Sequence, residues 1–197
     1  MAHETFSESL YHHNFIRFWF LEHAWDAHSG TVISPHPWLR TGPGKALDGK
    51  PKFDVTRFDD VYFKRLRQRA AAAGNRGFYV SIMLFDDWST ENPGPWEGHP
   101  FHVSNNINGI NVDLNNDGLG LEFHTLQIPT IIQLQEAYVR KVVDTVNDLD
   151  NIVYEIANET GISNQRIGSI IWSILSNPMK WGSRNSILLG QRLDGQS

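Results

Sequence analysis

A carboxylate at the end of a buried strand is the residue of this sequence best placed to do chemistry. Residues 151–157, NIVYEIA, form a short apolar run typical of a buried strand, and Asn158 and Glu159 follow it directly. Side chains alternate along a strand, so Glu155 and Glu159 lie on the same side. Partial burial raises the pKa of a carboxyl group toward the range useful to a general acid, and the Asn158 amide can hydrogen-bond a ligand hydroxyl. The residues therefore indicate acid–base chemistry, the alternatives for Glu159 being a solvated loop carboxylate or a charge at a helix N-terminus.

Two earlier strands and two helices are expected to position these residues. The apolar runs 14–21 and 77–85 are typical of buried strands, and apolar side chains recur every four residues over about 55–73 and about 130–149, which predicts helices. Strand, helix and strand in this order form a parallel crossover unit. Strands that are apolar on both faces fit a parallel sheet covered by helices.

Two long loops, residues 22–56 and 86–129, leave the carboxyl ends of the first two strands. In α/β folds, ligands bind at this side of the sheet. An indole ring can stack on a flat apolar face of a ligand, or it can simply pack beneath a long loop. Both roles are open for the tryptophans of these loops, which are Trp25, Trp38, Trp88 and Trp96. Trp19, inside the first strand, is expected in the core.

Polar residues in the second loop have simpler interpretations. Asp86 and Asp87 follow the second strand and could bind a ligand hydroxyl or cap the next turn, and we favour binding. His99, His102 and His124 lack the spacing of metal ligands and are expected to form hydrogen bonds within the loops. The sequence predicts neither a metal site nor a cofactor.

The segment NIVYEIANE, residues 151–159, resembles the fourth-strand signature of clan A glycoside hydrolases, the cellulase-like and apiosidase-like (β/α)8 barrels. The segment HNFIRFWF, residues 13–20, resembles their second strand, and residues 40–85 resemble the loop, helix and third strand that follow. Residues 99–111 and 124–159 continue the resemblance, which spans about 10–175. An Asn-Glu pair alone is a weak signal, whereas this ordered set over three strand–helix units is fairly specific.

The resemblance implies hydrolysis of glycosidic bonds in an oligo- or polysaccharide with retention of configuration. Glu159 corresponds to the acid/base, Asn158 to the residue that positions the sugar 2-hydroxyl, and Arg17 to the inward arginine of the second strand. A second carboxylate, about 5 Å away, would attack the anomeric carbon. Other substrate contacts expected from the loops and strand ends are Trp25, Trp38, Asp86 and Trp88. Glu155 is expected to be a buried partner of Arg17.

The chain departs from the family pattern in length. A complete (β/α)8 barrel takes about 250 residues, whereas this chain has 197, and only the second to fourth strands are recognised. No residue corresponds to the nucleophile. We expect one partial-barrel domain over residues 1–197 with an irregular tail at 176–197, as a piece of a larger enzyme or as a half-barrel that self-associates through its open sheet edges. The alternative function is a non-catalytic carbohydrate-binding or interaction fragment.

Composition excludes several other classes of protein. The 17 Lys and Arg residues are scattered among 22 Asp and Glu without a basic run, which argues against a nucleic-acid surface. No apolar run approaches the roughly 18 residues of a membrane helix, and the first residues lack the apolar core of a secretion signal. The absence of cysteine excludes disulfides and thiolate metal sites but does not identify a compartment, so the location is left unassigned.

Overall fold

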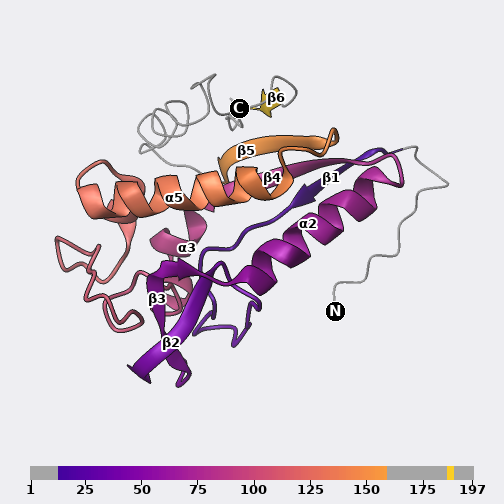
Figure 1. Cartoon of the computed structure of the whole chain (residues 1–197). Helices are drawn as coiled ribbons and strands as arrows, with labels where there is room; N and C mark the ends of the chain where they lie inside the picture. Colours follow the sequence, from indigo (N-terminus) through magenta and orange to yellow (C-terminus); the bar gives the residue numbers. More distant parts are fainter. Residues whose placement is uncertain (1–12, 159–185, 189–197) are drawn as a thin grey trace.

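The structure is a computed structural model that describes residues 13–158 and 186–188. Within these residues, four parallel strands form one sheet in the order β1-β4-β5-β6 (Figure 1). Their bounds are β1 Phe15–Phe18, β4 Tyr79–Asp86, β5 Ile152–Asn158 and β6 Ser186–Leu188. The fold is thus mixed α/β with a parallel sheet, as predicted, and the fourth strand lies in the tail that was expected to be irregular.

The register of the sheet brings the carboxyl ends of the strands together. Arg17 of β1 is opposite Ser81 of β4, and Asp86 at the end of β4 is opposite Asn158 at the end of β5. Parallel strands direct their carboxyl ends to one edge, so the two predicted polar residues become neighbours although 72 positions separate them.

The helices α2 (Asp60–Gly74) and α5 (Pro129–Val146) run along the same face of the sheet (Figure 1). Each buries one stripe of apolar side chains, such as Leu66 and Ala70 of α2 and Tyr138 of α5. The first helix begins later than the predicted residue 55, because residues 51–58 pair in a strand. Asp59 caps α2 by accepting a hydrogen bond from the Val61 amide at 2.9 Å.

A β-hairpin occupies the loop after β1, where no regular structure was predicted. Strands β2 (Trp38–Lys45) and β3 (Pro51–Phe58) pair antiparallel with a shifted register between Arg40 and Lys45. Gly42 and Gly44 have φ angles of 61° and 81°, which L side chains rarely adopt, so the irregular pairing falls at glycines. The sequence pattern hid the hairpin because prolines and glycines interrupt the alternation of side chains.

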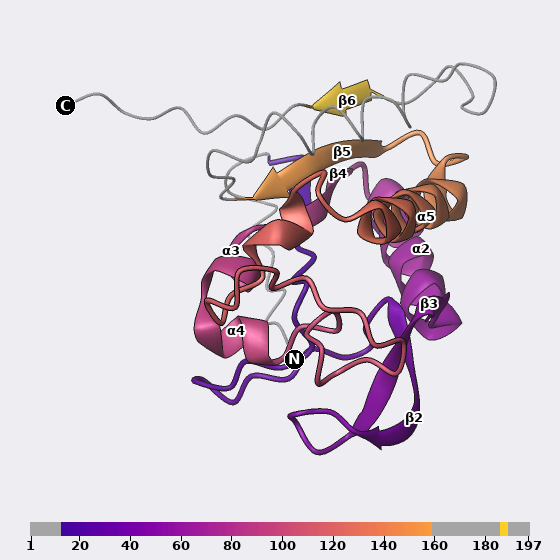
Figure 2. The same cartoon turned by 90° about the vertical axis from the view of Figure 1, so that its left-hand side faces the viewer.

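The loop after β4 folds into short helices (Figure 2), and its irregular part reaches the hairpin, where Asn106 forms a bridge with Phe53 of β3. These are α3 (Trp88–Glu91), α4 (Pro93–Glu97) and the 3-10 helix η1 (Leu121–His124). Trp96, Phe101 and Phe123 from this loop are buried in the same hydrophobic cluster as the strands. The loop is therefore part of the core. Its packing fixes the position of the residues that directly follow β4. None of the helices that the structure describes is long and apolar enough to cross a membrane.

Candidate functional site

Arg17 connects β1 to β5, the two strands that flank β4 in the sheet. Its Nε donates to Glu155 Oε2 at 2.6 Å, and its Nη2 hydrogen-bonds the other carboxylate oxygen of the same residue. Nη2 also donates to Asn158 Oδ1 at 3.0 Å. The predicted partnership of Arg17 and Glu155 is confirmed. A planar guanidinium holds a carboxylate in this two-pronged way better than an ammonium does, which accounts for arginine at this position.

Asn158 is held at both ends of its amide. Its oxygen accepts from Arg17, and its Nδ2 donates to Asp86 Oδ1 at 3.3 Å. The two contacts come from different strands and fix the amide at the carboxyl edge of the sheet. Glu159, the next residue, lies outside the described residues.

Asp86 is a buried carboxyl group, 1% exposed, at the end of β4. Besides Asn158, it accepts a hydrogen bond from Ser89 Oγ at 2.7 Å, and Ser89 Oγ also lies 2.8 Å from His23 Nδ1. Burial, helped by the nearby negative charge of Glu22, raises the pKa of Asp86 to about 6, although its two hydrogen bonds act in the opposite direction. Asp86 therefore exchanges a proton in the range between weakly acidic and neutral pH.

A second group of buried charged side chains contacts the backbone of Asp86. Glu22 Oε1 accepts from the Asp86 amide at 3.0 Å, and Glu22 Oε2 lies 3.3 Å from His99 Nε2 and 3.1 Å from His124 Nε2. His124 Nε2 also lies 3.4 Å from Asp87 Oδ1. This set of four side chains, Glu22, Asp87, His99 and His124, is called the buried charge cluster below.

Opposite charges outweigh desolvation at Glu22 and His124, whereas burial holds the pKa of His99 below its ordinary value. Burial alone would raise the pKa of Glu22, but His124 and His99 lower it to about 2. Burial alone would lower the pKa of His124, but Glu22, Asp87 and Asp86 raise it to about 9. Glu22 and His124 therefore form an ion pair at neutral pH that anchors the loop after β1 to η1. The sequence analysis did not identify Glu22. The signal that could have indicated it is its position directly after the apolar run 14–21.

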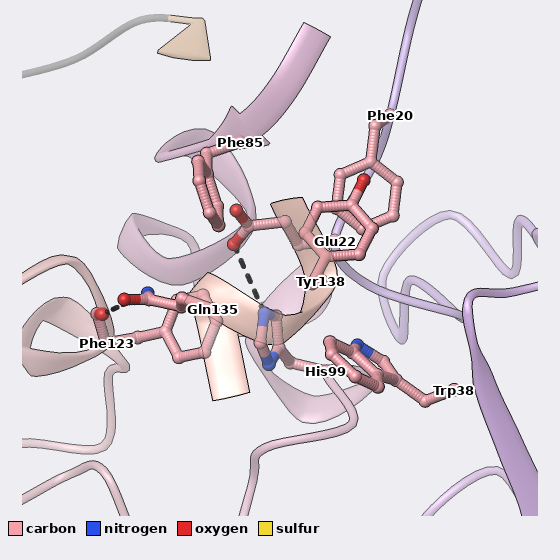
Figure 3. Close-up of a pocket in the computed structure, with 8 residues that line it drawn as sticks. All are labelled: Phe20, Glu22, Trp38, Phe85, His99, Phe123, Gln135 and Tyr138. Atoms are coloured by element: carbon pink, nitrogen blue, oxygen red, sulfur yellow. Dashed lines mark hydrogen bonds and ion pairs between the residues drawn. The ribbon is translucent and has the colours of Figure 1, made fainter. Parts of the chain in front are cut away.

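The cavity next to this ion pair is too small for a substrate. Glu22 and His99 face one another across it, among the aromatic rings of Phe20, Phe85 and Tyr138 (Figure 3). Its volume is about 10 Å³, which is room for about one water molecule. The buried charge cluster therefore has a structural role, and a ligand would have to bind outside this cavity.

The structure separates the tryptophans that the sequence grouped together. Trp38 is 6% exposed and stacks on Phe58 with ring centroids 5.1 Å apart, which places it in the core. Trp88 is 37% exposed, and its ring centroid is 5.7 Å from that of His23, beside the Asp86 network. Trp25 is half-buried and forms an isolated backbone bridge with Val32 of the same loop, whereas Trp96 is buried.

Trp19 was expected in the core, and this expectation is wrong. Strand β1 ends at Phe18, so Trp19 leaves the sheet and is 59% exposed. The guanidinium of Arg17 lies over its ring, 4.3 Å from the centroid.

No group of three or more His, Asp or Glu side chains within the described ranges is arranged to hold a metal ion. The predicted hydrogen bonds within the loops are seen for His99 and His102, whose Nδ1 atoms each accept from a backbone amide at 3.2 Å, whereas His124 pairs with the carboxylate of Glu22. The side chains that the structure brings together at the carboxyl edge, Arg17, Asp86 and Asn158, carry a guanidinium, a carboxyl and an amide group.

Comparison with solved structures relates the chain to glycoside hydrolases in fold. A structure from Bacteroides vulgatus ATCC 8482, a protein inferred to be a glycoside hydrolase, is 14% identical with a TM-score of 0.53. Two structures of endo-glycoceramidase II from Rhodococcus sp. are 16% and 15% identical, with TM-scores of 0.43 and 0.41. The matches cover 89%, 69% and 74% of this chain but only 29%, 37% and 46% of those chains. The chain thus shares the fold of the matched part of the Bacteroides structure, and it spans less than half the length of each of these structures.

A search of curated proteins finds no significant match. A family model, described as "Domain of unknown function (DUF6298)", matches residues 25–164, a range that contains Asp86, Asn158 and Glu159. Because this match covers well over half of the sequence, the chain belongs to the DUF6298 family.

Proposed function

We propose that the chain supplies the acid/base portion of a retaining glycoside hydrolase with a (β/α)8 barrel. One observation carries the proposal: the Asn158 amide is held between Arg17 and Asp86 at the carboxyl edge of a parallel sheet, directly before Glu159. An amide fixed in this way can present a donor or an acceptor to a sugar hydroxyl without first losing side-chain freedom. The glycoside hydrolase-like fold supports the same reading.

In this mechanism Glu159 protonates the oxygen of the leaving group. A second carboxylate attacks the anomeric carbon, and the glycosyl–oxygen bond breaks as the new bond forms. We assign that second carboxylate to a part of the barrel other than β1, β4 and β5. Asp86 does not serve as this nucleophile, because it is buried and its two oxygens are already hydrogen-bonded by Ser89 and Asn158.

The loops would complete the saccharide site. Trp88 is exposed beside the Asp86 network, and Trp25 is half-buried in the loop after β1, so we propose both as contacts for the substrate. Trp38 was proposed alongside them, but its burial suits support of the hairpin better than stacking on a sugar. We retain one domain over residues 1–197, whose open sheet edges would be covered by further strands or by a second copy.

Turnover of aryl glycosides tests the proposal. Without the second carboxylate, we expect negligible hydrolysis of a panel of aryl α- and β-glycosides by the chain alone. Added azide can attack the anomeric carbon in place of the missing group, while the leaving oxygen takes its proton from Glu159. We therefore expect azide-dependent release of the aryl alcohol and formation of a glycosyl azide.

The matched variants are Glu159→Gln and Glu91→Gln, the latter an exposed glutamate on α3. Azide-dependent release should disappear in the first and persist in the second. Azide-dependent release of the aryl alcohol that is unchanged by Glu159→Gln would contradict the acid/base role. If the chain hydrolyses the glycosides without azide and Glu159→Gln abolishes this activity, Glu159 is the acid/base but the chain is not a partial barrel that lacks the second carboxylate. Saccharide binding with no release in any condition would favour the non-catalytic alternative.

A further inference from the structure

We infer that His23 is a positioning residue for the proposed reaction, which acts through Ser89 on the carboxyl group that holds the Asn158 amide. The inference rests on the proposed function for the role of Asn158 and extends it to two residues that the mechanism has not used. His23 and Ser89 are 2% and 0% exposed, so neither is accessible to a substrate. Their hydrogen bonds form one chain with Asp86 and Asn158, with distances of 2.8 Å from His23 Nδ1 to Ser89 Oγ, 2.7 Å from Ser89 Oγ to Asp86 Oδ2 and 3.3 Å from Asp86 Oδ1 to Asn158 Nδ2.

The hydroxyl group of Ser89 has a single proton, and this proton decides the direction of the chain. When Asp86 is ionised, the hydroxyl donates to its Oδ2, and Ser89 Oγ can only accept from His23. His23 must then carry its ring proton on Nδ1. Ser89 Oγ also accepts from the Glu22 amide at 3.3 Å, so Ser89 has both a donor and an acceptor partner even apart from His23.

A proton on Asp86 reverses the direction of the chain. The proton cannot lie on Oδ1, because Asn158 Nδ2 can only donate to that atom and the amide oxygen is held by Arg17 Nη2. It lies on Oδ2 and is donated to Ser89 Oγ, and the Ser89 hydroxyl then donates to His23 Nδ1. One proton from solvent thus binds His23 Nε2, the Nδ1 proton moves to Ser89, and the Ser89 proton moves to Asp86. In both states Oδ1 accepts from Asn158, so the amide keeps its orientation.

The imidazole of His23 can serve both states because it stays neutral. Burial, helped by His99, lowers the pKa of His23 to about 4, although Asp26 and Glu22 act in the opposite direction. The pKa of Asp86 is about 6, so His23 changes its tautomer and not its charge in the range where Asp86 takes up a proton.

The electrostatic surroundings of the chain stay constant in this range. The titratable and charged groups that face it are Glu22, Asp26, His99, His124 and, through Asn158, Arg17. Glu22 and His124 are the charged pair nearest to Asp86, and their pKa values of about 2 and about 9 keep both ionised between pH 4 and pH 8. A change in this interval therefore reports on Asp86.

The chain connects two proposed substrate contacts. The exposed ring of Trp88 has its centroid 5.7 Å from that of His23, and Asn158 lies at the other end. His23 thus supports the indole by ring contact and the amide through hydrogen bonds. Ionised Asp86 accepts from Asn158 in a charge-assisted hydrogen bond, which polarises the amide and makes its oxygen a better acceptor for a sugar hydroxyl. Substrate binding should therefore become tighter as Asp86 loses its proton.

Nitrogen-15 magnetic resonance of the full chain tests the inference, because the bare and the protonated nitrogens of a neutral imidazole have distinct chemical shifts. We expect His23 to carry its ring proton on Nε2 at pH 5 and on Nδ1 at pH 8, with a midpoint of about 6. The side-chain amide of Asn158 should shift with the same midpoint. In Asp86→Asn the new amide donates to Ser89 at every pH, so His23 should keep its proton on Nε2 throughout.

Two substitutions separate the hydrogen bond from the space that the ring fills. His23→Phe keeps an aromatic ring but offers no acceptor, so the protonated form of Asp86 leaves the Ser89 hydroxyl proton unpaired. The ionised form loses less, because Ser89 Oγ still accepts from the Glu22 amide. The midpoint of the Asn158 signal should therefore fall by about one pH unit. His23→Asn supplies an amide that can donate or accept near the position of Nδ1, and it should return the midpoint to about 6.

The azide reaction measures the effect on substrate binding. The KM for an aryl glycoside that gives azide-dependent release should be lower above about pH 6 than below it, and His23→Phe should move this change together with the Asn158 midpoint. The requirement for Glu159 should be the same in both chains. The matched control is His28→Asn, which removes an exposed histidine of the same loop and should leave the midpoint and the KM profile unchanged.

Three results would overturn the inference. These are a wild-type His23 that keeps one tautomer from pH 5 to pH 8, an unchanged midpoint in His23→Phe, and an equal shift in His28→Asn. The tautomer measurement uses the unaltered chain, so it gives a result even if a variant does not fold. Glu159-dependent release without tautomer exchange would reject the role of His23 and retain the proposed function. Tautomer exchange without release would reject the acid/base role of Glu159 and retain the hydrogen-bonded chain.

Discussion

Replacing Asp86 by asparagine should change how the stability of the protein depends on pH. The carboxyl group has a pKa of about 6 in the folded chain, against an ordinary value of 3.8. Between these two values the unfolded chain has released the proton and the folded chain still holds it, so stability falls as pH rises from 3.8 to about 6. Asparagine resembles the protonated acid and does not titrate. The variant should therefore lose this part of the pH dependence.

The difference in pKa fixes the magnitude. At about 1.36 kcal/mol for each pH unit, a rise from 3.8 to about 6 corresponds to about 3 kcal/mol, and the interval from pH 4 to pH 8 contains most of it. Near pH 4 the variant should differ little from the wild type, since an asparagine oxygen can still accept from Asn158. Near pH 8 the free energy of unfolding of the variant should be about 2 to 3 kcal/mol higher, relative to that of the wild type, than it is near pH 4.

Urea unfolding followed by tryptophan fluorescence at pH 4, 5, 6, 7 and 8 measures this difference. The matched control is Asp144→Asn, which removes an exposed carboxylate on α5. Its unfolding free energy should run parallel to that of the wild type. If the Asp86→Asn curve also runs parallel to the wild type, the carboxyl group does not hold its proton as the buried network requires, and the reasoning fails.

Three other substitutions test the packing around the site. Glu22→Gln should lower the free energy of unfolding at pH 7 by about 3 to 5 kcal/mol, because it leaves the charge of His124 buried without its main partner; a loss below about 1 kcal/mol in urea unfolding would contradict the ion pair. Gly98→Ala should cost at least about 3 kcal/mol, since the new Cβ would overlap the Trp25 carbonyl, and a normal melting temperature would show that the loops do not approach this closely. Arg17→Lys should cost about 1 to 2 kcal/mol through loss of the two-pronged contact and should alter the tryptophan emission, because the guanidinium no longer covers an indole; an unchanged spectrum would contradict that stacking.

The strands and long helices could be predicted because their apolar patterns are long and uninterrupted. The strand bounds differ from prediction by one to three residues, as for the run 77–85, which forms β4 at Tyr79–Asp86. The hairpin of β2 and β3 could not be predicted, because Gly42, Pro43 and Gly44 break the alternation that identifies a strand. Its pairing depends on tertiary contacts, since the buried Phe53 and Val55 anchor it to the core.

The candidate site could be predicted only in part from the sequence. Arg17, Asp86 and Asn158 were recognised from their places at strand ends and from the family resemblance, and the structure joins them in one network. Glu22 and its pairing with His99 and His124 were not recognised, because these residues come together from loops separated by up to 102 positions. The exposure of Trp19 was missed because the apolar run continues past the point where hydrogen bonding in β1 stops.

Nuclear magnetic resonance of the side chains at the carboxyl edge tests whether this edge is the saccharide site. The Asn158 side-chain amide and the Arg17 Nε–H are observable in a chain labelled with nitrogen-15, and Asn158→Ala assigns the first of these signals. Adding an oligosaccharide should shift both signals along one saturating binding curve, with the amide of Asp144 on α5 unchanged. Binding that shifts neither signal would place the saccharide elsewhere and contradict a catalytic edge built on Arg17, Asp86 and Asn158.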